Sequence, residues 1–133
     1  MKPVCLIILL ISCVLQVSAE PLVKHKVGPS YPRLAWQAGI QGTVTVEIEL
    51  DTDGNVVSAK ASGAHEMLQR AAEENIRLWT FSEVTPDQHT LTFTYVYRIV
   101  SPEQGRYSTR LPVKFDLPHR RIEISVYPAE INP

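Results

Sequence analysis

The chain has 133 residues, of which 44% are hydrophobic, with 13 Lys and Arg against 14 Asp and Glu. This length and composition fit one globular domain and leave little room for a second. The formal net charge of −1 gives no basic excess to neutralise nucleic-acid phosphates, so we expect no nucleic acid among the partners.

The first twenty residues have the pattern of a targeting segment. Residues 4–17 are almost wholly apolar behind Lys2, and the small residues Ser18 and Ala19 come just before Glu20. This pattern predicts a signal peptide over residues 1–19 that is removed on secretion. A membrane anchor is the alternative, but a helix of that length spans only about 21 Å, against roughly 30 Å of hydrocarbon.

Both cysteines, Cys5 and Cys13, lie in this segment, so we expect the mature chain to lack thiols and disulfides. Residues 10–13 also resemble a lipobox, the bacterial signal for attaching lipid to a cysteine. Lipidation of Cys13 is therefore an alternative to plain secretion. Only in that case do we expect the protein to contact a membrane.

Residues 20–30 form a short lead-in without clear periodicity, and a short helix is predicted to follow it. Ser30 can accept a hydrogen bond in the first turn, Pro32 is tolerated there, and Gly39 can end the helix. Trp36 falls off the apolar side of this helix. It is therefore expected either to pack over the lead-in or to face a partner.

The clearest strand signal covers residues 42–50, where apolar and polar side chains alternate. Asp53-Gly54 then supplies a tight turn, and residues 55–61 return as a second strand. Glu47 and Glu49 share the polar face, as the carboxylates of a glycosidase would. Solvated charge on the wet face of a strand explains them better.

Residues 64–79 have apolar side chains at helical spacing, which predicts a helix with one buried face. Trp79 ends this stripe and is assigned to the core. Asn75 lies within the stripe, where its amide needs a partner that the sequence does not name. On the opposite face, Glu66 with Arg70 and Glu73 with Arg77 are acid–base pairs four residues apart, which we interpret as solubilising charges.

The longest alternating run covers residues 90–100 and predicts a strand. A loop is predicted to follow, and residues 121–127 predict one late strand. Elements in this order predict an α+β domain of two layers, in which helices pack on a three-stranded antiparallel sheet. The late strand is a possible extra strand at the C-terminus.

The residues that carry chemistry do not form a recognisable site. The four histidines are scattered, and the sequence has no nucleophile, phosphate-binding or zinc motif. We therefore expect a protein that is not an enzyme, with no metal, no cofactor and no small-molecule substrate. An enzyme with an unrecognised site is the alternative, and a pocket with converging polar side chains would support it.

The backbone of residues 90–100 is the better candidate for function. If this strand lies at the edge of the sheet, its N–H and C=O groups can pair with an extended segment of a partner. The alternative is that the late strand, or a second copy of the protein, already covers this edge. The candidate partner-binding residues are Thr90, Leu91, Thr92, Phe93, Thr94, Tyr95, Val96, Tyr97 and Arg98.

Several short motifs together resemble the C-terminal domain of TonB-family energy transducers. They are Tyr31-Pro32, Gly39-Ile40-Gln41-Gly42, Asp53-Gly54, Ser62-Gly63, Ala71-Ala72 and Trp79-Thr80-Phe81. The resemblance implies a domain over residues 31–100, with helices on a three-stranded antiparallel sheet, and makes residues 101–133 a loop and strand extension. It also implies that residues 90–100 pair with a segment of an outer-membrane receptor.

The chain also departs from full transducers of this family. Those proteins keep an N-terminal membrane helix with a histidine and a long Pro-rich spacer, whereas residues 4–17 contain no histidine. We therefore expect a stand-alone module in the periplasm of a Gram-negative bacterium. It would bind an outer-membrane receptor or another envelope protein in TonB-dependent transport. The alternative is a structural envelope protein that self-associates, for example as a homodimer.

Overall fold

The computed structural model describes residues 21–85, 88–100 and 113–129. Their elements are β1 (Val23–His25), α1 (Arg33–Gln37), β2 (Gly42–Leu50), β3 (Val56–Ser62), α2 (Glu66–Ile76), β4 (Thr80–Phe81), β5 (Thr90–Ile99), β6 (Lys114–Asp116) and β7 (Arg121–Val126). The predicted signal peptide, Cys13 and the loop after β5 lie outside the described residues. None of the described helices has the length and apolar character needed to cross a bilayer.

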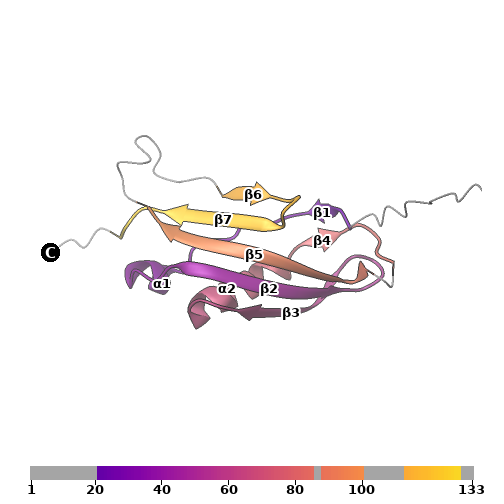
Figure 1. Cartoon of the computed structure of the whole chain (residues 1–133), viewed down its shortest axis with the longest axis horizontal. Coiled ribbons are helices and arrows are strands. Elements are labelled where there is room, and N and C mark those ends of the chain that lie inside the picture. The colour runs from indigo at the N-terminus through magenta and orange to yellow at the C-terminus, as the bar shows by residue number, and fades with distance from the viewer. Residues whose placement is uncertain (1–20, 86–87, 101–112, 130–133) are drawn as a thin grey trace, which may run out of the picture.

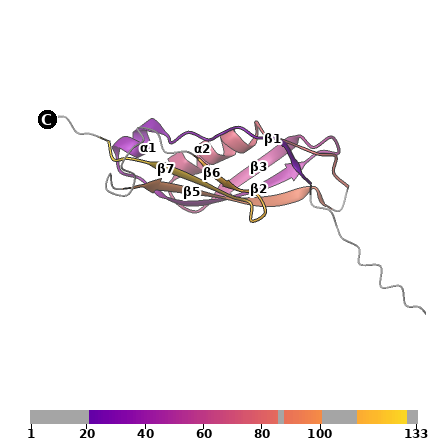
Figure 2. The ribbon, with the colours of Figure 1, turned by 90° about the horizontal axis from the view of Figure 1, so that it is seen from above.

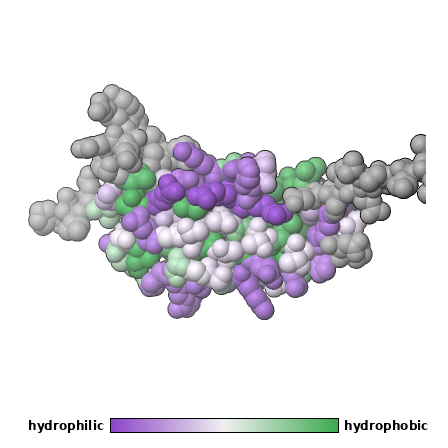
Figure 3. All heavy atoms as spheres, viewed as in Figure 1, coloured by the Kyte–Doolittle hydropathy of each residue, from purple (hydrophilic) through white to green (hydrophobic). Residues whose placement is uncertain are grey.

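One sheet of five strands, in the order β3-β2-β5-β7-β6, forms the first layer. Both helices lie on one face of this sheet (Figure 1 and Figure 2). The opposite face carries mostly residues of hydrophilic or intermediate hydropathy (Figure 3). β2 pairs antiparallel with β3 and with β5, whereas β7 pairs parallel with β5. The α+β class is confirmed. A purely antiparallel sheet of three strands is wrong for the whole molecule, because the β6–β7 hairpin extends the sheet beyond β5.

The predicted hairpin between β2 and β3 is confirmed, and its turn explains the Asp and Gly residues. Asp51 Oδ1 accepts hydrogen bonds from the backbone N–H groups of Asp53 and Asn55, at 3.0 and 2.8 Å. Gly54 has a φ of +86°, and a Cβ built there would lie 2.0 Å from the carbonyl oxygen of Phe81. A side chain at this position would therefore push the chain after α2 out of place.

Both predicted helices form, with different ends from those expected. Ser30 does not cap α1; the N-cap is Pro32, and no side chain bonds there. α2 begins at Glu66, with His65 as its N-cap, and ends at Ile76. The chain then tightens, with the N–H of Trp79 donating to the carbonyl of Ile76, so that the Trp79 side chain turns into the core.

Sequence patterns missed three short strands. β1 and β4 form a separate antiparallel pair, in which Val23 lies opposite Phe81. β6 pairs antiparallel with β7. Strands of two or three residues contain no measurable alternation, so tertiary pairing decides them rather than local pattern.

Aromatic side chains fill the space between the sheet and the helices. Trp79 is 1% exposed, which confirms its assignment to the core. Its ring centroid lies 5.6 Å from that of Phe93 on β5 and 5.9 Å from that of Phe115 on β6. The β6–β7 hairpin therefore packs into the same core as the rest of the domain.

Candidate partner-binding edge

The candidate residues Thr90 to Arg98 all lie on β5, as predicted. β2 pairs with β5 from Thr90 to Tyr97. On the other side, β7 pairs only from Thr94 to Ile99. The late strand therefore covers part of the candidate edge, which is the alternative that the sequence left open. We call the side of β5 that faces away from β2, from Thr90 to Arg98, the β5 rim.

The backbone groups on the β5 rim belong to the even-numbered residues. The N–H of Thr94 donates to the carbonyl of Arg120 at 2.8 Å, and the N–H of Val100 donates to that of Val126 at 2.9 Å. Because backbone groups alternate sides along a strand, the groups of Thr90 and Thr92 point the same way. Within the described ranges no strand pairs with these two residues on that side.

The odd-numbered side chains of β5 point into the core and fix the strand against α2. Tyr95 O–H donates to Asn75 Oδ1 at 2.8 Å, and Trp79 Nε1 donates to the same oxygen at 3.1 Å. Asn75 Nδ2 in turn donates to the carbonyl of Val27 at 3.0 Å. These contacts supply the partners that the sequence could not name for Asn75, which is 7% exposed.

Burial also sets the titration of the β5 tyrosines. It raises the pKa of Tyr95 and that of Tyr97 well above the ordinary value, and a neighbouring tyrosine adds to the shift in each case. Burial likewise raises the pKa of Tyr31 to about 12. Tyr97 O–H has no hydrogen-bond partner in the described part of the chain. These phenols are neutral at neutral pH, so they present no charge to a guest on the β5 rim.

β7 is held on the β5 rim mainly by burial. Ile122 and Ile124 lie opposite Tyr95 and Tyr97 and are 0% and 3% exposed. Between them, Glu123 Oε1 lies 3.6 Å from a guanidinium nitrogen of Arg98, whose side chain is 51% exposed. An ion pair that open to solvent contributes little.

Trp36 connects α1 to the end of β7. Its Nε1 donates a hydrogen bond to the carbonyl of Tyr127, and the side chain is partly buried. Trp36 therefore contacts the tail, which neither expectation from the sequence included. The two residues are 91 positions apart, so no local pattern in the sequence signals this contact.

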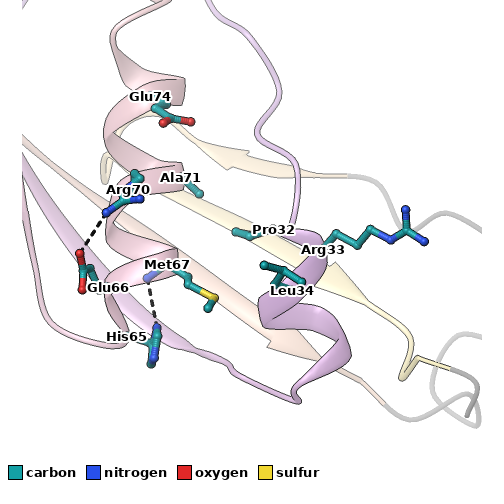
Figure 4. Close-up of a pocket in the computed structure, with 9 residues that line it drawn as sticks. All are labelled: Pro32, Arg33, Leu34, His65, Glu66, Met67, Arg70, Ala71 and Glu74. Carbon is teal, nitrogen blue, oxygen red and sulfur yellow. Dashed lines mark hydrogen bonds and ion pairs between the residues drawn. The ribbon is translucent and has the colours of Figure 1, made fainter.

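A groove of about 500 Å³ lies between α1 and α2 (Figure 4). Leu34 and Met67 give it apolar walls, and Glu66 on its border pairs with Arg70 at 3.0 Å. His65 Nδ1 accepts the N–H of Met67, so this nitrogen caps the helix. Of the polar residues that line the groove, Glu66 and Arg70 thus bond to each other, and His65 bonds to backbone.

Metal ligation has no support in the described ranges either. No group of three or more His, Cys, Asp or Glu residues stands there in a position to hold an ion. His119 Nδ1 lies 2.9 Å from Asp116 Oδ2 in the turn of the β6–β7 hairpin, as an exposed pair. This pair is a turn contact.

A family model and two similar proteins indicate the same family for this chain. Residues 27–100 match the family described as Gram-negative bacterial TonB protein C-terminal. The chain is 43% identical to Protein TonB of Vibrio cholerae serotype O1 over 68 residues, which is 50% of this chain and 28% of the relative. It is 33% identical to Protein TonB of Xanthomonas campestris pv. campestris over 91 residues, 67% of this chain and 34% of the relative.

The chain spans about a third or less of the length of these relatives. The matched region contains α1, β2, β3, α2, β4 and β5, and it ends at the close of β5. β6 and β7 follow that region. The match covers more than half of the 133 residues, and the chain belongs to the TonB C-terminal domain family.

Proposed function

We propose that this chain is a periplasmic protein-binding module of TonB-dependent transport. Its β5 rim pairs with an extended segment of an outer-membrane receptor or another envelope protein. Family membership and the similarity to two proteins named TonB support the link to this transport. The geometry of β5 supports the mode of binding.

One observation carries the proposal. Within the matched region the sheet has the order β3-β2-β5, so β5 is its outer strand. β7, from beyond that region, adds to this outer strand in parallel and inserts Ile122 and Ile124 into the core. The β5 rim is therefore a surface that accepts an added strand, and the chain's own tail shows how such a strand sits.

The partner segment, or guest strand, first pairs with the part of the β5 rim that β7 does not cover. The outward groups of Thr90 and Thr92 offer the first backbone hydrogen bonds, and pairing further along β5 displaces β7 from Thr94 onward. The guest then gains the contacts that β7 gives up. Backbone pairing supplies affinity, while the pockets beside Tyr95 and Tyr97 select apolar side chains at alternate positions.

The experiment measures binding of labelled, overlapping peptides from the outer-membrane receptors of the source organism to the purified protein. Thr92→Pro removes an outward N–H of the β5 rim and keeps the pairing with β2, since proline is tolerated at a strand edge when its N–H faces solvent. We expect it to weaken binding by roughly tenfold or more, the effect of losing a backbone hydrogen bond.

The matched control is Thr92→Val, which keeps the outward N–H of the β5 rim and the branched shape of the side chain. It should leave the affinity unchanged, and circular dichroism checks that both variants are folded. Equal binding by the two variants would overturn the proposal. A stable dimer that binds none of the peptides would instead support the structural, self-associating alternative.

A further inference from the structure

The edge of the sheet opposite β5 is covered by side chains. We call the backbone side that faces away from β2, from Val57 on β3 to Gly63 just after this strand, the β3 rim. Two residues of α2 and its C-cap residue, Arg77, bond to this backbone. Gln69 Nε2 donates to the carbonyl of Gly63 at 2.7 Å, Glu73 Oε1 accepts the N–H of Ala61 at 2.8 Å, and Arg77 donates to the carbonyl of Ala59 at 3.2 Å.

The spacing of these residues explains how one helix can cover a strand. Gln69, Glu73 and Arg77 are four residues apart, which corresponds to about 6 Å along an α-helix. Their targets are two residues apart on a strand that runs the opposite way, which corresponds to roughly 6.7 Å. The two repeats nearly match, so one row of side chains reaches the three outward residues from Ala59 to Gly63 in turn. We call these three residues the α2 row.

The α2 row takes the groups that an incoming strand would need. In a parallel ladder, a residue of the added strand bonds to the carbonyl before and the N–H after the residue opposite. At Lys60 these groups are the Ala59 carbonyl and the Ala61 N–H, and Arg77 and Glu73 occupy both. Nearer the start of β3, the register shifts beside Val57, and such a bulge also blunts an edge.

Another acid–base pair on the same helix shows that this contact is specific to the row. Glu66 and Arg70 bond to each other at 3.0 Å, with side chains 77% and 69% exposed. Glu73 and Arg77 have the same spacing and bond to strand backbone instead. The interpretation of Glu73 and Arg77 as merely solubilising charges is therefore incomplete.

We infer that the α2 row acts as a side-chain substitute for a strand and keeps the β3 rim from pairing with a second copy of this chain. It leaves β5 as the side of the matched sheet that takes an added backbone strand. This inference goes beyond the proposed function, because the row closes the β3 rim whether or not a receptor segment binds β5.

Amide hydrogen exchange tests the cover directly and needs no partner. Glu73→Ala should raise the exchange rate of the Ala61 N–H by about tenfold or more, since that N–H loses a bond to a charged acceptor. The Lys60 N–H, which points toward β2, should keep its rate, and Glu73→Gln should restore part of the Ala61 protection. Glu66→Ala is the control. An Ala61 rate that does not change in Glu73→Ala overturns the inference.

Sedimentation tests the consequence. The double variant Glu73→Ala with Arg77→Ala should show a mass that rises with concentration above that of the wild type. The double variant Glu66→Ala with Arg70→Ala removes the same charges from the same helix and should match the wild type. Equal masses for the two doubles overturn the inference. If the first double variant unfolds, the exchange rates of the single Glu73 variants decide.

Discussion

The two rims of the β3-β2-β5 sheet are closed in different ways. On the β3 rim, the three side chains of the α2 row bond to backbone groups and add no strand. On the β5 rim, β7 adds a strand of backbone and buries two isoleucines in the core. The first cover belongs to the region that matches the family, whereas the second comes from residues beyond it.

This difference indicates which rim can exchange its cover. A guest strand on the β3 rim would have to turn the side chains of the α2 row away from the backbone groups that they bond. β7 can be replaced by another strand, because the same backbone bonds and apolar positions are offered to both. Variants of β7 and β5 measure how firmly the two strands are held, and the largest effect is expected in β7.

Ile122→Ala removes the side chain that β7 buries most completely. We expect the free energy of unfolding to fall by about 2–4 kcal/mol, since a cavity would remain beside Tyr95. Val57→Ala on the β3 rim, where the side chain is 58% exposed, should change it by less than about 0.5 kcal/mol. Urea unfolding measures both. Equal effects would show that β7 is not part of the core.

Alkaline pH should weaken the attachment of β5 to the core. Burial raises the pKa of Tyr95 and Tyr97 in the folded state above the value of about 10 in the unfolded chain. The free energy of unfolding therefore keeps its full value below pH 10 and falls as the pH rises further, because the tyrosines of the unfolded chain lose their protons first. The expected slope is about 1.4 kcal/mol per pH unit for each tyrosine.

Urea unfolding at a series of pH values from 8 upward measures this slope. The double variant Tyr95→Phe with Tyr97→Phe should flatten it, because neither side chain can then ionise. A slope that is the same in the wild type and the double variant would mean that other groups control alkaline unfolding.

The two tyrosines should differ when each loses its hydroxyl at neutral pH. Tyr95→Phe removes the bond to Asn75 and should cost about 1–2 kcal/mol. Tyr97→Phe removes a buried hydroxyl without a partner in the described residues, so its cost should be near zero. Thermal unfolding of the two variants under one buffer condition gives the comparison. The opposite order would contradict the hydrogen bonding described for β5.

Trp36→Phe should loosen only the far end of β7. The variant removes the donor to the Tyr127 carbonyl and should cost roughly 1 kcal/mol. Exchange of the Val100 N–H, which is bonded to Val126, should become faster. The Thr94 N–H, bonded to Arg120 at the other end of the pairing, should keep its rate. Similar changes at both ends would show that Trp36 stabilises the whole domain rather than this end.

The sequence predicts the parts of this fold that depend on a local repeat of apolar side chains. Alternation predicts β2 from residues 42–50 and β5 from residues 90–100. Asp53-Gly54 predicts the hairpin turn, and the apolar stripe that ends at Trp79 predicts α2. In each case a repeat over several residues specifies which side chains face the core. The late strand was predicted for the same reason.

The pairing of distant segments could not be predicted in this way. β7 alternates like any half-buried strand, and nothing in residues 121–127 specifies that it lies parallel to β5. Glu73 and Arg77 have the spacing of a surface ion pair, but their bonds to β3 depend on the distance between a helix and a strand. The sequence predicts the candidate site as a strand and leaves open whether the late strand covers it; the structure gives the extent of that cover, from Thr94 to Ile99.

Nitrogen-15 NMR of the full protein during titration with a receptor peptide tests the central claim most directly. The account predicts that the Thr90 and Thr92 amides shift and become protected, while the amides of Ile122 and Ile124 lose their protection as β7 leaves. The amides of β3 and of the groove between α1 and α2 should be unaffected. Shifts confined to β3 or the groove, with β7 still protected, would contradict the account.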